Sequence, residues 1–313
     1  MNKVYLKSVD IVGFKSVALP VHIDFFGNLN AILGLKDTGK SNILEAVGWC
    51  LSDEITSYRD IFSGNDKLKE AKSAEATLTF SDSEGKDLNI SRKIQPQDNK
   101  KLEDLRFING QLVSINRFKA FLSSYGLSIP LFWNIAFITL SDLLLDFFTA
   151  TGVTTYFEFF MSRIAVSKPI SFSFITLQKE FQNVFPKIIK GGKAILDSIK
   201  TEDNYPKSFK LSVQFPGKPM LDCSDLSHKE KILTSYILLL AVYKTSPKPL
   251  CLLDDVDNDY YVELNKIIES LSEETQCIVV TNTKETLVLS TSMIGVSRDD
   301  YDSSKVMTLK KAD

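Results

Sequence analysis

The chain has 313 residues, of which 44% are hydrophobic and 24% charged, a composition ordinary for a globular protein with a large core. Its 37 basic and 39 acidic residues give a formal net charge of −2, which excludes a global basic footprint for nucleic acid. With 2 histidines and 4 widely spaced cysteines, the chain lacks metal-ligand spacing and is expected to be intracellular, in the nucleus or cytoplasm. No apolar run approaches a membrane span and no signal peptide is recognisable, so we expect no membrane contact.

The first half of the chain is rich in expected β-strands. Strands are expected at 4–12, 21–26, 29–33, 74–80 and 88–94. Asn109-Gly110 stands between two short apolar runs and is the strongest hairpin signal in the chain. A helix is expected at 116–124, and the apolar segment 131–160 is expected to hold a strand and a buried helix.

Residues 34–41, GLKDTGKS, fit the phosphate-binding pattern G-x-x-x-x-G-K-[ST]. We call them the phosphate loop. An expected strand before the loop and an expected helix after it would aim backbone N–H groups and the positive end of the helix dipole at one point. Lys40 is expected to reach the β- and γ-phosphates of ATP, and the Ser41 hydroxyl to ligate Mg²⁺. The other candidate nucleotide-binding residues here are Gly34, Lys36, Asp37, Thr38, Gly39 and Asn42.

The second half of the chain alternates helices with strands, which predicts a parallel sheet covered on both faces. Helices are expected at 174–189, 228–243 and 262–271, and strands at 194–199, 209–215, 250–253, 277–280 and 291–296. The strand 250–253 runs into Asp254-Asp255, which has the form of a Walker B element. Asp254 is expected to hold Mg²⁺, and Asp255 occupies the position of the group that orients the attacking water.

In this order, the motifs resemble the head of the structural maintenance of chromosomes (SMC) family, within the ABC-type ATPases. The matching segments are GFKS from Gly13, GLKDTGKSNILEAVGWCLSD from Gly34, AEATLTFSD from Ala74, LSHKEK from Leu226 and LLDDVD from Leu252. The resemblance covers almost the whole chain and is closest to condensin-type subunits. It implies an α/β, two-lobed P-loop ATPase head with ATP and Mg²⁺ as cofactors. The N-terminal lobe would be 1–155 with a mixed sheet, the bridge 156–172, and the C-terminal lobe 173–313 with a parallel sheet.

Several positions depart from the family's pattern. Only a short connection, near 156–170, stands where the family has a long coiled coil and a hinge; its composition favours a natural deletion over an engineered truncation. The signature loop, LSGGE or LSGGQ in the family, here ends in Ser227, His228, Lys229 and Glu230. Two bulky residues would be strained if their backbone needs positive φ. Asp255 replaces the usual glutamate, and no glutamine occurs between residues 112 and 177 to serve the family's Q-loop.

These departures predict weak or absent hydrolysis. The favoured hypothesis is a degenerate head that binds ATP·Mg²⁺ as a structural or regulatory ligand and acts as a protein-interaction module. Two alternatives remain: an active ATPase head that pairs with another SMC-type head in chromosome organisation, and a nucleotide-free scaffold. The resemblance adds Lys15 and Arg59 as candidate phosphate contacts, although each is also explained as a solvated surface charge. We expect a protein partner, either another SMC-type head or a larger assembly, and no direct contact with DNA.

Overall fold

The computed structural model describes residues 4–52, 61–62, 73–96, 102–127, 174–200, 206–254, 256 and 260–311. The chain divides into two compact units. Unit 1 comprises residues 1–137, 249–254 and 275–313, and unit 2 comprises 138–248 and 255–274. Unit 1 therefore draws on both halves of the chain, whereas the lobe boundaries expected from the sequence follow chain order and stay a prediction. Residues 131–160 and the bridge 156–172 lie outside the described part.

Unit 1 contains a six-stranded antiparallel sheet in the order β2-β1-β4-β5-β6-β7. Its strands are β1 (Val4–Val12), β2 (Val21–Asp24), β4 (Ala74–Asp82), β5 (Asp87–Pro96), β6 (Leu102–Ile108) and β7 (Gln111–Leu112). Every neighbouring pair in this sheet is antiparallel. Among the described strands of the first half, β3 (Leu29–Leu33) has parallel partners, and it joins a second sheet of unit 1 that contains both parallel and antiparallel pairs.

That second sheet of unit 1 has the order β11-β12-β3-β13-β14. Its strands from the second half of the chain are β11 (Leu250–Leu253), β12 (Gln276–Val280), β13 (Ser292–Arg298) and β14 (Ser304–Lys310). The first four strands of the sheet are parallel, and β14 pairs antiparallel with β13 at the edge. The expected parallel sheet is therefore confirmed in its centre, but it incorporates β3 and ends in an antiparallel strand that the sequence pattern did not predict.

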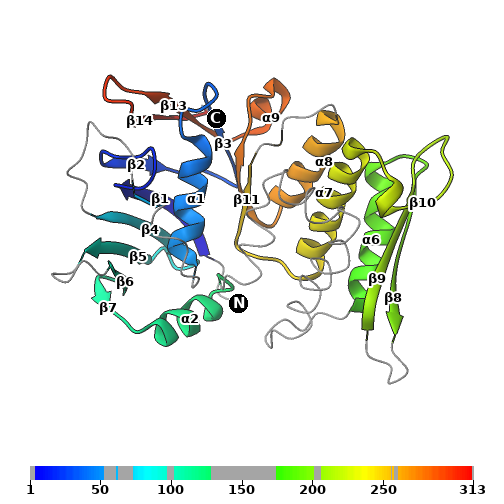
Figure 1. The fold of residues 1–313 in the computed structure, drawn as a ribbon, viewed down its shortest axis with the longest axis horizontal. Helices are drawn as coiled ribbons and strands as arrows, with labels where there is room; N and C mark the ends of the chain where they lie inside the picture. Colours follow the sequence, from blue (N-terminus) through cyan, green and yellow to red (C-terminus); the bar gives the residue numbers. More distant parts are fainter. Residues whose placement is uncertain are drawn as a thin grey trace. The chain divides into compact units, whose positions relative to one another are not determined.

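Helix α1 (Lys40–Leu51) is enclosed by unit 1. It packs on β1, β4 and β5 and also contacts β12, and its buried residues run from Ile43 to Leu51 with Glu45 half-buried (Figure 1). The smaller helices α2 (Ile115–Ser124) and α9 (Lys284–Leu289) contact β6 and β3. Because α1 is covered on nearly all sides, its start is fixed relative to both sheets.

The described part of unit 2 contains three α-helices and a small antiparallel sheet (Figure 1). The helices are α6 (Phe174–Ile188), α7 (His228–Thr245) and α8 (Tyr261–Ser272), and the sheet has the order β10-β9-β8, from β8 (Lys193–Lys200), β9 (Pro206–Gln214) and β10 (Leu221–Asp222). Helix α6 packs on β8 and α7, with Phe185 in edge contact with both Phe181 and Phe215. Within the described part of the chain, no helix combines the length and apolarity needed to cross a membrane.

Candidate nucleotide-binding site

The phosphate loop closes on itself directly before α1. Gly39 is the N-cap of α1 and has φ 101°. The Lys40 ammonium donates to the carbonyl oxygens of Gly34 (3.0 Å) and Leu35 (2.7 Å), and the Thr38 hydroxyl donates to the same Leu35 carbonyl (2.9 Å). The loop is therefore a compact turn around the Lys40 ammonium, at the positive end of a 12-residue helix.

Two glycines of the loop leave no room for a side chain. A Cβ on Gly34 would lie 2.2 Å from the carbonyl oxygen of Val296, and one on Gly39 would lie 2.1 Å from the Ser304 hydroxyl. Both residues have positive φ. The backbone here forms a cradle that only glycine can complete, with a helix N-terminus, an ammonium and the Ser41 hydroxyl as donors. This set of groups fits a polyphosphate.

The carboxyl ends of three neighbouring parallel strands bring further groups to the loop. Asp254 follows β11, Asn282 follows β12, and Gly34 follows β3. Asp254 is 3% exposed, and Asn282 accepts a hydrogen bond from the Gly34 amide through its side-chain oxygen (3.2 Å). In open α/β sheets, ligands bind beyond the carboxyl ends of the strands. The phosphate loop and the Asp254 carboxylate therefore share this edge of the sheet, and the roles expected for Ser41 and Asp254 stay a prediction.

A Mg²⁺ ion is compatible with these donors. Such an ion takes one or two protein oxygens, keeps several waters and binds substrate phosphates, so it needs no protein cage of its own. The Ser41 hydroxyl and the Asp254 carboxylate are oxygen donors of this kind. Among the described residues, no group of three histidine, cysteine, aspartate or glutamate side chains that could hold a metal ion occurs.

Other predicted contacts have different positions. The Lys15 ammonium pairs with Glu45 of α1 and lies 6.0 Å from the Phe14 ring centroid, so its assignment to the nucleotide stays a prediction. The Asn42 amide donates to the Ser16 hydroxyl (2.6 Å), which ties α1 to the turn after β1. Arg59 and Asp255 lie outside the described residues. Lys36 and Asp37 are exposed on the loop.

The degenerate signature segment forms the start of α7 in unit 2. Ser227 is the N-cap, and it exchanges hydrogen bonds with Glu230 in a capping box. His228 and Lys229 are the first two residues of the helix. Their backbone is therefore helical, and the strain expected from positive φ at these positions does not arise. This part of the sequence argument was wrong, because the segment S-x-x-E is itself a helix-start pattern.

Glu230 is stabilised as a carboxylate at this helix start. Its side chain is 3% exposed, and Lys218 donates to it at 2.9 Å. Burial would raise the pKa of Glu230, but the hydrogen bonds from Ser227 and Lys218 outweigh burial and lower that pKa. The segment thus retains a well-formed helix N-terminus even though the glycines of the family's loop are absent.

The RecF/RecN/SMC N-terminal domain family matches residues 5–305 of the chain. The chain belongs to this family. The chromosome partition protein Smc of Clostridium kluyveri is 32% identical over 142 residues, which are 44% of this chain and 12% of that protein. Smc of Bacillus subtilis is 29% identical over 149 residues, 46% of this chain and 13% of that protein. The chain therefore matches about an eighth of the length of these relatives.

Solved SMC heads share the fold over the whole chain. An Smc head bound to the C-terminal winged-helix domain of ScpA has a TM-score of 0.73 at 23% identity, covering 98% of both chains. A Pyrococcus furiosus Smc head bound to the C-terminal domain of ScpA has a TM-score of 0.75 at 21% identity, covering 98% of this chain and 96% of that one. The Thermotoga maritima SMC head domain has a TM-score of 0.67 at 22% identity, covering 98% of this chain and all of the other. The predicted family and the ABC-type α/β head are confirmed.

Two residues of this SMC-type head contact the backbone carbonyl groups of the phosphate loop and were not predicted from the sequence. Arg298 donates to the carbonyl oxygen of Asp37 (2.8 Å from Nε), and the Ser304 hydroxyl donates to that of Thr38 (2.7 Å). Both lie at the ends of the turn between β13 and β14. A polar turn that contains one arginine and two serines carries no motif, and β14 itself was not predicted, so no signal in the sequence identified them.

Proposed function

We propose that this chain is an SMC-type head that works inside the cell. It would bind ATP·Mg²⁺ as a structural or regulatory ligand and present a surface to a protein partner, with weak or absent hydrolysis. The observation that carries the proposal is the glycine cradle at Gly34 and Gly39, closed around Lys40 at the start of α1. A nucleotide-free scaffold would not require a loop backbone that accepts only glycine at these two positions.

This chain's own residues account for binding without turnover. The loop amides and Lys40 would hold the phosphates, and Ser41 with Asp254 would hold Mg²⁺, which neutralises phosphate charge when it is bound. Asp255 is one methylene shorter than the glutamate usual at this position, and a displacement of about 1 Å at a reacting group can cost roughly a hundredfold in rate. The exposed Asp37 adds a negative charge to the loop.

An active head remains the second candidate, because the helical backbone of His228 and Lys229 removes one objection to it. Such a head would complete its site with another SMC-type head. Measurable ATP turnover that is abolished by Asp255→Asn would establish this alternative and contradict the proposal of a regulatory ligand.

Thermal unfolding with and without ATP·Mg²⁺ tests the proposal. A ligand at a hundredfold over its Kd stabilises the folded state by about 2.7 kcal/mol, so the wild-type chain should melt several degrees higher with nucleotide. Lys40→Ala should lose most of this shift, since it removes the ammonium that we expect to contact the phosphates. Lys86→Ala, in the exposed turn between β4 and β5, is the matched control and should keep the shift. The absence of a shift in the wild-type protein would favour the nucleotide-free scaffold.

The partner surface is proposed on the outward face of β13 and β14. Met307 is 67% exposed and Leu309 is 56% exposed, and the cross-strand register places Met293 opposite Leu309. Gly295 lies opposite Met307, and its absent side chain leaves the strip flat. Exposed neighbouring apolar residues of this kind mark interaction surfaces. Because two related heads are solved with C-terminal domains of ScpA, we assign this strip to a winged-helix domain of that type.

Titration of the chain with a purified ScpA C-terminal domain tests this surface. Met307→Glu places a charge in the centre of the strip and should weaken binding at least about tenfold, as expected for a buried interface anchor. Val288→Glu changes an equally exposed apolar residue on α9, outside the strip, and should bind like the wild type. Equal affinities of all three proteins would show that the partner does not cover this strip.

A further inference from the structure

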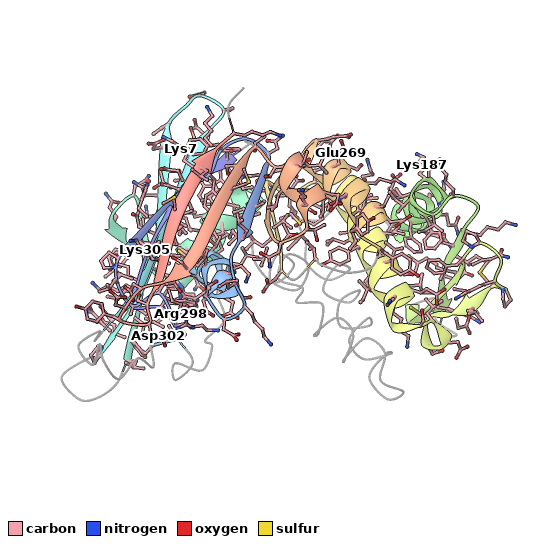
Figure 2. The ribbon with its side chains drawn as sticks, turned by 90° about the horizontal axis from the view of Figure 1, so that it is seen from above. Lys7, Lys187, Glu269, Arg298, Asp302 and Lys305 are labelled. Atoms are coloured by element: carbon pink, nitrogen blue, oxygen red, sulfur yellow. The ribbon has the colours of Figure 1, made fainter. Side chains whose placement is uncertain are left out.

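The geometry points to the β13–β14 hairpin as the element that aims the phosphate loop, with Arg298 and Ser304 as positioning residues. Figure 2 shows Arg298 and Asp302 close together at one end of this strand pair. The inference rests on the proposed function for its ligand, but it concerns contacts that exist within this chain alone.

Arg298 binds the phosphate loop through one backbone carbonyl group, that of Asp37. Its Nε and one terminal nitrogen both donate to the carbonyl oxygen of Asp37, and its other terminal nitrogen donates to the carbonyl oxygen of Asp302 (2.8 Å) and pairs with the carboxylate of Asp302 (2.7 Å). The guanidinium is planar and rigid, so four contacts fix its position. The Asp37 carbonyl is therefore held from the side of the hairpin.

Ser304 binds the phosphate loop through the next backbone carbonyl group, that of Thr38. Its hydroxyl lies 2.7 Å from the Thr38 carbonyl oxygen and 2.8 Å from the Ser16 hydroxyl, and its amide donates to the Ser16 carbonyl (2.8 Å). The Ser304 side chain is 2% exposed. It also packs so closely on Gly39 that a Cβ there would lie 2.1 Å from its hydroxyl.

These two contacts determine where the loop amides point. A trans peptide unit is planar, with its N–H opposite to its C=O. Holding the Asp37 carbonyl toward the hairpin therefore turns the Thr38 amide away from it, and holding the Thr38 carbonyl does the same for Gly39. The two amides then face away from the hairpin, toward the side on which the proposed function places the phosphate. Arg298 and Ser304 thus act on the ligand only through the loop.

The loop needs such support at Asp37. This residue has φ 63°, in the left-handed region that is unfavourable for a non-glycine residue. Arg298 makes charge-assisted hydrogen bonds to the carbonyl of this same residue, and such bonds are stronger than neutral ones. The hairpin itself is ordered, because the Asp299 carboxylate accepts from the amides of Tyr301 (2.9 Å) and Ser303 (2.8 Å).

Two measurements on the full chain test the inference, using Arg298→Ala and Ser304→Ala, with Arg298→Lys as a conservative variant. The matched control is Lys305→Ala, which removes an exposed charge from the same hairpin. The first measurement is amide hydrogen exchange at residues 34–41 without nucleotide. The second is ATP·Mg²⁺ affinity, measured at a temperature where every variant is folded.

We expect loss of exchange protection at the loop in Arg298→Ala and Ser304→Ala, and ATP affinity about tenfold weaker, as for removal of a hydrogen bond to a charged group. Arg298→Lys should recover part of both, and Lys305→Ala should match the wild type. Unchanged loop exchange in both alanine variants would overturn the inference, whatever their affinity. If the alanine variants lose exchange protection at the loop but the wild-type chain binds no nucleotide, the hairpin's role is supported and the proposed function is contradicted.

Discussion

Replacement of Arg92 by alanine is expected to reduce the free energy of unfolding of unit 1 by about 3–5 kcal/mol, the usual effect of breaking a buried ion pair. Arg92 is completely buried on β5. Its Nε and one terminal nitrogen donate to the two carboxylate oxygens of Asp104, at 3.0 and 2.7 Å. The variant would leave the Asp104 charge nearly buried, paired with Arg106 (3.2 Å).

The same guanidinium also caps the end of α1. Its remaining terminal nitrogen donates to the carbonyls of Trp49 (2.8 Å) and Ser52 (3.1 Å), and the group stacks 4.9 Å from the Trp49 ring. A cation at a helix C-terminus satisfies orphan carbonyls and opposes the negative end of the dipole. Helix α1 begins at the phosphate loop. Loss of the Arg92 contacts at the C-terminal end of this helix should therefore also weaken nucleotide binding.

Urea unfolding of Arg92→Ala and Lys93→Ala would measure the effect. Lys93 is the next residue on β5, and it pairs with Glu75 (3.3 Å) at a partly exposed position, where an ion pair contributes about 0–1 kcal/mol. Arg92→Lys should not restore stability, since an ammonium cannot make the paired contacts of the planar guanidinium. If both alanine variants unfold at the same urea concentration, the capping role assigned to Arg92 is wrong.

Local features of the fold were predictable because local physics determines them. The bounds of β1, β3 and β11 agree with the apolar runs from which they were predicted, and Asn109-Gly110 forms the β6–β7 hairpin. The phosphate loop was recognisable because its chemistry requires glycines and a lysine at fixed spacing. In each case the decisive interactions lie within a few residues along the chain.

Strand pairing was not predictable from such patterns. β3 lies between β12 and β13, whose residues are more than two hundred positions away, and its five-residue apolar run fits a buried strand of any parallel sheet. β14 has exposed apolar side chains at Met307 and Leu309, so its alternation does not read as a core strand. Contacts that join distant segments, such as Arg298 to Asp37, leave no trace in one sequence.

The signature segment shows a different kind of error. Here the signal existed: Ser227 followed three residues later by Glu230 is the pattern of a capping box. The structural consequence is that the helix start is intact, with Ser227 as its N-cap.

Gly34→Ala is expected to destabilise unit 1 by about 2–5 kcal/mol and to abolish nucleotide binding. The added Cβ would lie 2.2 Å from the Val296 carbonyl oxygen and 3.0 Å from the Thr38 hydroxyl. The first obstacle is backbone of β13, the neighbouring parallel strand, so it cannot rotate away as a side chain would. Overpacking of this kind costs about 1–3 kcal/mol, and positive φ adds about 1–2 kcal/mol for alanine.

Gly85→Ala separates the two causes. Gly85 also has positive φ, but a Cβ there would meet nothing within 4 Å, so this variant should lose only the conformational part, about 1–2 kcal/mol, and bind ATP normally. Chemical unfolding and nucleotide titration of both variants provide the comparison. In the Gly34 variant, we expect β3 and β13 to separate at the start of the loop, which would also move the Gly34 amide away from Asn282. Equal losses of stability in the two variants would mean that β13 yields to the methyl group and that the loop is not held as tightly as its contacts indicate.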